Sequence, residues 1–447
     1  MSKKKSQLIL GAFLPDAGHH LAAWRYPGAR ADGGLNFPHY WRLAQKAERG
    51  KFDFIFLSDG MGIRDHAHGL DELSRPGHAH LVHFEPLTLL SALSVVTERI
   101  GLVATASTHC NEPYHIARQF ASLDHLSDGR AGWSVTASGH NAQTEVAARY
   151  ERAREFLHVV SSLWDSWDDD AFLRDKTSGA YFDPDKLHAL DHCGKHFSVR
   201  GPLSVARSPQ GQPVIIQTNS SSEAALELAA ETAEILFTAQ RTFAEAKAFY
   251  SNMKEKLAKY DRSPDDLKIT PGVFPVIGRT EQEAIDKYEE LQELIDPKSG
   301  LTLLSELMGD IDLSPYPLDE PLPALLDNRA GKYRLKELTD LVGRENRTLR
   351  QLYMSLAGPR GHKMILGTPE QIADQFEEWF KGGAADGFNI MPPYLPGALD
   401  EFVELVIPLL QQRGLFRTEY EGRTLREHLG LRRPINKFTK AKEYSSA

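Results

Sequence analysis

Short apolar runs rich in β-forming residues alternate along this chain with segments of helical periodicity. Eight runs occur, at Leu8–Phe13, Phe52–Leu57, Ile100–Thr105, Ala131–Thr136, Val214–Gln217, Ile235–Thr238, Ile269–Val276 and Gly387–Met391. The helical segments that separate them are Pro38–Arg49, Pro86–Thr97, Ile116–Leu126, Arg149–Trp164, Ser222–Ala233, Phe243–Lys259, Glu281–Ile295 and Pro369–Lys381. Such alternation is typical of parallel βα units, and eight of them predict an α/β fold, a (β/α)8 TIM barrel.

Two connections are too long for simple barrel loops, at about residues 165–212 and 296–366. Connections of that length usually carry function or their own structure. The second contains Ser314-Pro-Tyr-Pro, Glu320-Pro-Leu-Pro and a Gly/Arg-rich stretch to Arg360, a pattern that suits a lid over the barrel mouth. We expect residues 1–447 to form one barrel domain with these two insertions, a helix after Pro408 and a polar C-terminal extension from about residue 434.

Composition excludes several classes of function. The formal net charge is −9 and the basic residues are scattered, which argues against a nucleic-acid-binding surface. No apolar run approaches the ~20 residues of a membrane span, and the N-terminal residues lack a signal-peptide pattern, so we expect a cytoplasmic protein. The two cysteines and the loop histidines lack metal-ligand spacing, so no metal site is expected.

Polar residues end four of the predicted strands, where the active sites of such barrels gather. These ends read Ser58-Asp-Gly60, Thr105-Ala-Ser-Thr108, Thr136-Ala-Ser-Gly139 and Gln217-Thr-Asn-Ser-Ser-Ser222. Turn chemistry alone favours Ser, Asp and Gly and accounts for part of this pattern. Hydroxyls, an amide and one carboxylate suit a neutral heteroaromatic ring such as a flavin better than a metal ion.

The serines after the fifth strand predict an anion site. Ser220 and Glu223 have the spacing of a capping box, so the helix is expected to begin at Ser220 with unpaired N–H groups facing outward. A flavin phosphate suits such an end, with the Tyr150 hydroxyl as a second donor. Because serine caps helices in general, a purely structural role stays open. The chain contains neither G-x-S-x-G nor G-x-x-x-x-G-K-[ST], which disfavours hydrolases and nucleoside triphosphatases.

The chain resembles the bacterial-luciferase-like flavin monooxygenases, and within them the nitrilotriacetate monooxygenase component A group. The resemblance covers roughly residues 8–433 and includes the site segments Asp59-Gly60, Ala104–Thr108 and Arg149–Ala153. The other segments that carry it are Ala23-Trp-Arg25, Ala47–Asp53, Asn111–Tyr114, Ala117–Trp133, Phe197–Pro202 and Arg207–Gly211. Each segment alone is weak evidence for the family, whereas all of them together and in this order are specific to it.

This resemblance implies a two-component enzyme. A separate NAD(P)H:FMN reductase delivers reduced FMN, which reacts with O2, and the flavin peroxide so formed oxygenates a small organic substrate, often with cleavage of a C–N or C–S bond. The flavin contacts carried over are Asp59, Thr105, Tyr150, Ser221 and Ser222. We expect a homo-oligomer, a dimer or a tetramer, with no nucleic-acid or membrane partner.

The sequence departs from the family pattern at one position and leaves several roles open. Relatives carry a His four residues before the Tyr, where this chain has Val146, and we suggest that His140 or Asn141 fills the space. The catalytic acid or base and the substrate are not assigned. The candidates for lining the substrate side are His20, Trp24 and Arg25.

Two other functions remain open from the sequence. One is a flavin- or deazaflavin-dependent reductase of the same superfamily, and the other is a flavin-binding protein without turnover. The long insertions favour turnover, because a lid is useful where an intermediate must be sheltered.

Overall fold

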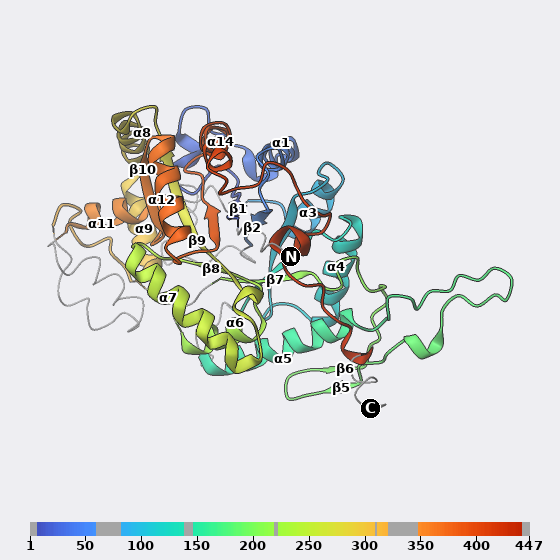
Figure 1. The fold of residues 1–447 in the computed structure, drawn as a ribbon. Helices are drawn as coiled ribbons and strands as arrows, with labels where there is room; N and C mark the ends of the chain where they lie inside the picture. Colours follow the sequence, from blue (N-terminus) through green and yellow to red (C-terminus); the bar gives the residue numbers. More distant parts are fainter. Residues whose placement is uncertain are drawn as a thin grey trace.

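Eight parallel strands close into a barrel in the computed structural model, as the sequence predicts (Figure 1). The structure describes residues 7–59, 82–137, 146–218, 222–308, 311–320 and 347–439. The barrel strands are β1 (Ile9–Phe13), β2 (Phe54–Leu57), β3 (Gly101–Ser107), β4 (Ala131–Thr136), β7 (Val214–Thr218), β8 (Ile235–Thr238), β9 (Lys268–Ile277) and β11 (Gly387–Ile390). They pair in the order β1-β2-β3-β4-β7-β8-β9-β11, and β11 returns to β1.

A further strand, β10 (Lys363–Gly367), was not expected from the sequence. It pairs in parallel with the second half of β9, from Val273 to Ile277, beyond the part of β9 that pairs with β8. Because β9 has ten residues, it extends past the carboxyl end of β8, which spans four. Its exposed edge there accepts β10, which belongs to the second insertion.

Helices cover the outside of the barrel and match the predicted segments. They are α1 (Phe37–Arg49), α3 (Pro86–Ser94), α4 (Pro113–Leu126), α5 (Val146–Trp164), α6 (Glu223–Thr232), α7 (Phe243–Lys256), α8 (Glu281–Glu293) and α12 (Pro369–Lys381). Local chemistry fixes several of their starts. Helix α12, for example, begins with Pro369 at its first position and a capping box between Thr368 and Gln371.

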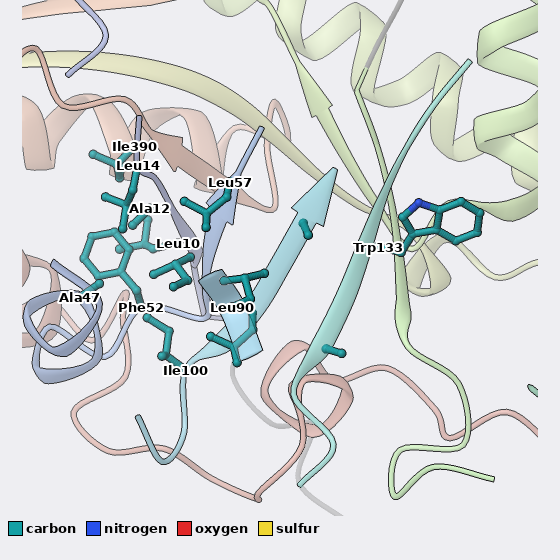
Figure 2. Packing of buried hydrophobic residues seen from close by; sticks show 14 of the residues in the cluster. Leu10, Ala12, Leu14, Ala47, Phe52, Leu57, Leu90, Ile100, Trp133 and Ile390 are labelled. Carbon is teal, nitrogen blue, oxygen red and sulfur yellow. The ribbon is translucent and has the colours of Figure 1, made fainter. Parts of the chain in front are cut away.

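Alternate residues of the barrel strands belong to two different layers of the core. Figure 2 shows Leu10, Ala12, Leu57 and Ile390, which belong to the large cluster that strands and helices share. Residues of opposite parity, such as Phe54 of β2 and Val103 of β3, join a second cluster. Since successive side chains of a strand point to opposite faces, the second cluster fills the barrel interior.

The amino-terminal end of the barrel is closed by the short helix α15 (Leu425–Leu429). Leu425 and Leu429 are buried in the interior cluster, and a Cβ placed on Gly101 or Gly132 would lie 2.6 Å or 3.4 Å from methyl groups of Leu425. Arg426 of the same helix binds Glu234, which precedes β8, with an Nη2–Oε2 distance of 2.9 Å. The opposite end, where the strands finish, is the barrel mouth.

Both insertions contain structure of their own. The first carries the two-stranded antiparallel hairpin β5 (His192–Cys193) and β6 (Ser198–Val199), and parts of it extend well beyond the barrel on the right of Figure 1. The second carries α9 (Pro297–Leu307), α11 (Leu349–Leu356) and β10. Leu21 and Ala22, on the loop after β1, pack in one cluster with α9 and α11, so this insertion lies beside the mouth. Residues 321–346, which belong to the expected lid, lie outside the described residues, and a single barrel domain stays a prediction.

Residues 397–412 are helical, comprising α13 (Gly397–Glu401), a π-helical turn (Phe402–Val406) and α14 (Ile407–Gln412). Further along, Asn436 donates to the carbonyls of Asp165 and Trp167, both at 3.0 Å. The described part of the C-terminal extension therefore packs on the start of the first insertion.

Candidate active site

Inward-facing polar side chains line the half of the barrel that is nearest the mouth. Thr105 of β3 has the same parity as the interior residue Val103 and lies in register with Ser134 of β4. Thr270 of β9 and Asn389 of β11 share the interior parity of their strands, and the Thr270 hydroxyl and the Asn389 side-chain oxygen are buried without a hydrogen-bond partner in the described chain. Buried polar atoms of this kind usually have a partner, so the interior suits a polar ligand.

Aromatic rings form the apolar side of the mouth. Phe13, Phe56 and Phe237, from β1, β2 and β8, pack against one another with ring centroids 4.6–6.0 Å apart. The His362 ring stacks on Phe237 at 5.1 Å, and His19 contacts Phe13 at 4.3 Å. These aromatic residues were not predicted as site residues from the sequence, although each phenylalanine has interior parity in a predicted strand.

The expected start of α6 is wrong by two residues. Ser222, rather than Ser220, is the N-cap, and its hydroxyl accepts a hydrogen bond from the Ala225 N–H at 3.3 Å. Glu223 is the first helical residue, rather than the third position that a capping box requires, and it pairs with Lys256 of α7 at 2.6 Å. Any of the three serines satisfies the cap preference, and the ion pair to a helix far along the chain is invisible to local spacing. Residues 219–221, which include Ser221, lie outside the described residues.

The N-terminal ends of α5 and α6 lie on the same side of the barrel. Their preceding strands, β4 and β7, are neighbours, and the two helices pack together with an ion pair between Arg154 and Glu231 at 2.7 Å. Tyr150 is half-buried in the second turn of α5. Next to it in sequence, the Arg149 Nε is buried with no hydrogen-bond partner in the part of the chain that the structure describes. Two helix N-termini and the unsatisfied Arg149 Nε favour an anion on this side of the barrel.

Asp59 follows β2 and is partly buried. Its Oδ1 lies 3.4 Å from the His83 Nε2, so a histidine of the same β2–α3 connection contacts the carboxylate. Val146 begins α5 and is 41% exposed, whereas His140 and Asn141 lie outside the described residues.

The three candidates for the substrate side have different surroundings. Arg25 is exposed and its guanidinium donates to the Leu294 carbonyl at the end of α8, which gives it a structural contact. Trp24 is half-buried. His20 is fully buried, and this burial, with a smaller contribution from the charge of Arg360, lowers the pKa of His20 to about 3. His20 is therefore neutral at physiological pH.

Within the described residues, no group of three or more His, Cys, Asp or Glu side chains is arranged to hold a metal ion. Both cysteines, Cys110 and Cys193, are free and exposed. No helix in the described part of the chain is long and apolar enough to cross a membrane.

A model of the luciferase-like monooxygenase family matches residues 18–386. The chain belongs to this family. N-acetyl-S-(2-succino)cysteine monooxygenase of Bacillus subtilis (strain 168) is 51% identical, over 98% of this chain and 100% of the relative. Nitrilotriacetate monooxygenase component A of Aminobacter aminovorans is 49% identical, over 97% of this chain and 98% of the relative.

Among solved structures of luciferase-like monooxygenase relatives, riboflavin lyase (RcaE), determined with modified FMN and riboflavin, superimposes with a TM-score of 0.85. It is 31% identical to this chain and covers 96% of it, and 97% of the lyase is matched. The family membership confirms the resemblance expected from the sequence and identifies the chain as a monooxygenase.

Proposed function

We propose that the chain is the oxygenase of a two-component system that uses reduced FMN and O2 to oxygenate a small organic substrate. The observation that carries this proposal is the arrangement at the mouth: two helix N-termini beside an unsatisfied Arg149 Nε, next to inward polar side chains on β3 and β4. In a luciferase-like monooxygenase, such a mouth suits a phosphate and a polar ring system.

The names of the relatives support a separate reductase and the type of bond cleaved. One relative is a component A, which implies a second component, and we infer an NAD(P)H:FMN reductase that delivers the flavin. N-acetyl-S-(2-succino)cysteine contains a C–S bond and nitrilotriacetate contains C–N bonds. Cleavage of a C–N or C–S bond is therefore the reaction that we propose for this chain.

The residues present fit FMN. Ser222, Tyr150 and Arg149 would hold the phosphate, together with Ser221, and Thr105 and Asp59 would contact the ring system. The Lys256 ion pair neutralises Glu223, the one carboxylate in the first turn of α6. A carboxylate at this position would otherwise repel a phosphate, and the ion pair with Lys256 offsets that repulsion.

When bound, reduced FMN would supply the O2 chemistry, and the chain's own residues would position the reactants. The Phe13, Phe56 and Phe237 rings exclude water from one side of the mouth, which strengthens polar contacts inside it. The Thr105 and Ser134 hydroxyls lie in register on neighbouring strands and can orient a ligand by donating or accepting hydrogen bonds. His20 is neutral, so its burial does not place an unpaired charge inside the protein.

We also propose that the chain forms a homo-oligomer in the cytoplasm. A groove of about 420 Å³ runs between α3 and α4 on the barrel surface, lined by Leu87, Leu123 and Leu126 among polar residues. Leu126 is 59% exposed, and apolar exposure of this kind suits a contact between subunits. Light scattering of the purified chain checks the proposal, and a monomer at micromolar concentration contradicts it.

Reconstitution with an added NAD(P)H:FMN reductase tests the proposed reaction. We expect NADH-dependent O2 uptake and incorporation of one ¹⁸O atom into a product from N-acetyl-S-(2-succino)cysteine or nitrilotriacetate. We also expect the chain to bind reduced FMN more tightly than oxidised FMN, because it must collect the cofactor from a partner. Flavin that stays bound through purification and is reduced directly by NADH would contradict the two-component proposal, and oxygenase assays without any product would favour a flavin-binding protein.

A further inference from the structure

The turn between α11 and β10 presents an arginine at the barrel mouth. Arg360 has a left-handed backbone, with φ +47°, and its N–H donates to the Leu356 carbonyl at 3.2 Å. Two residues later, the His362 N–H donates to the Pro359 carbonyl at 2.8 Å. A non-glycine residue with positive φ is uncommon and costs free energy, so a site of this kind often has a function.

Contacts of His362 place this turn at the mouth. Its ring stacks on the inward-facing Phe237 with an interplanar angle of 11°. A Cβ at Gly272 of β9 would lie 2.4 Å from the His362 Nδ1, so glycine at that position makes room for the ring. On the other side of the turn, Gly358 approaches His20, where a Cβ would lie 3.3 Å from the imidazole. The turn therefore sits between the ends of β8 and β9 and the loop that follows β1.

Arg360 has no side-chain partner among the described residues, and protein atoms crowd its guanidinium. Its side chain reaches solvent, yet the protein packed around the guanidinium lowers its pKa from the usual value. Within the described chain, Arg360 makes no side-chain hydrogen bond, and the one charge that raises its pKa is that of Glu306.

The neighbouring histidines do not share this charge. Burial and then the charge of Arg360 lower the pKa of His20 to about 3, and burial lowers the pKa of His362 to about 4. Both rings are neutral at pH 7, which leaves Arg360 as the charged member of the three. The His20 Nδ1 accepts from the Ala22 N–H at 3.2 Å, so its ring proton lies on Nε2, which has no acceptor among the described residues.

We propose that Arg360 binds a carboxylate of the substrate, so that the enzyme acts on organic acids. A guanidinium donates two parallel hydrogen bonds to a carboxylate, and partial removal from water strengthens them. The chain as a whole carries a net charge of −9, which disfavours anions, so a local cation is required to hold an acid at the mouth. The proposal rests on the proposed function and adds to it the chemical class of the substrate.

Calorimetric titrations with FMN present test the subsite. The probes are N-acetyl-S-(2-succino)cysteine, nitrilotriacetate, a panel of simpler mono- and dicarboxylates, and the methyl esters of the same acids. We expect Arg360→Gln to weaken binding of the acids by about ten- to a hundred-fold and to leave the neutral esters unaffected, whereas Arg360→Lys retains part of the affinity. The control is Arg200→Gln, which loses the same charge at a side chain that is 88% exposed, and it should bind like wild type.

A purely structural role would give a different result. Because no group among the described residues pairs with the Arg360 side chain, Arg360→Gln should keep the wild-type melting temperature. A lower melting temperature with equal losses for acids and esters would overturn the proposal, as would a wild type that binds no acid of the panel at millimolar concentration. Flavin-dependent O2 uptake without substrate, measured in the same variants, reports on the proposed function separately. A chain that binds acids through Arg360 but consumes no O2 would contradict the function and leave the subsite standing.

Discussion

Ser222 is expected to have two roles, and replacing it separates them. The hydroxyl caps α6 through the Ala225 N–H, and we propose that it also binds the FMN phosphate. Loss of a serine N-cap costs about 1 kcal/mol of folding free energy. Loss of a hydrogen bond to a charged group costs about 1.5–3 kcal/mol, so Ser222→Ala should weaken FMN binding roughly ten- to a hundred-fold. Riboflavin lacks the phosphate and should bind wild type and variant about equally.

A second substitution at the same position makes the test sharper. Aspartate caps helices as well as serine does, but its carboxylate repels a phosphate. Stability should therefore be similar with Ser and Asp and lower with Ala, whereas FMN affinity should fall in the order Ser, Ala, then Asp. Thr368→Ala is the matched control, because Thr368 caps α12 through the Gln371 N–H at 3.4 Å, and its loss should lower stability without changing FMN affinity.

The assay combines anaerobic titration with reduced FMN and reduced riboflavin and thermal unfolding of each variant. Equal losses of affinity for the two flavins would show that Ser222 only caps the helix. FMN affinity of Ser222→Asp at the wild-type level would refute the phosphate contact directly, since the charge would then meet no phosphate.

Three further predictions concern stability. Asp53→Asn leaves the buried Arg417 guanidinium without its carboxylate partner and should destabilise the protein by about 3–5 kcal/mol in urea unfolding, and unchanged stability would show that the pair contributes nothing. Burial lowers the pKa of His428 from 6.5 to about 4. The neutral His428 therefore stabilises the fold above pH 6.5, and this stabilisation is lost as the pH falls toward 4. The loss is about 3 kcal/mol, at ~1.4 kcal/mol per pH unit. His428→Phe should flatten the stability curve in that window, and a parallel curve would contradict the assignment. Thr270→Val removes a buried hydroxyl without a partner among the described residues, so it should raise stability by about 1 kcal/mol while weakening ligand binding; lower stability would indicate an internal partner.

The barrel could be predicted because its signal is local and repeated. Each strand carries apolar residues on both faces, as in the Phe54-Ile-Phe-Leu57 run of β2, where all four residues are buried. Such runs are required when a parallel sheet is covered by helices outside and filled by side chains inside. The parity of Thr105 within β3 follows from the same pattern, so its inward position was also readable from the sequence.

Elements that depend on distant partners could not be predicted. β10 pairs with β9 because β9 extends beyond the end of β8 and leaves an unpaired edge there. Sequence spacing does not reveal this difference in strand length. Glu223, the first residue of α6, forms an ion pair with Lys256, which lies 33 residues further along the chain. In both cases a local preference was present, and a long-range contact selected among the alternatives that it allowed.

The groups that we assign to ligands share a property that no sequence pattern encodes. The Arg149 Nε, the Thr270 hydroxyl and the Arg360 guanidinium are defined by what they do not touch within the described chain. An unsatisfied polar group in a crowded site lowers stability, and a chain keeps such groups where a ligand completes them. Arg149 lies at the start of α5 and Arg360 follows α11, so the two cations come from different parts of the mouth. Because one cation suits a phosphate and the other a carboxylate, the mouth can hold a cofactor and an acidic substrate together, as an oxygenase that must bring both to one place requires.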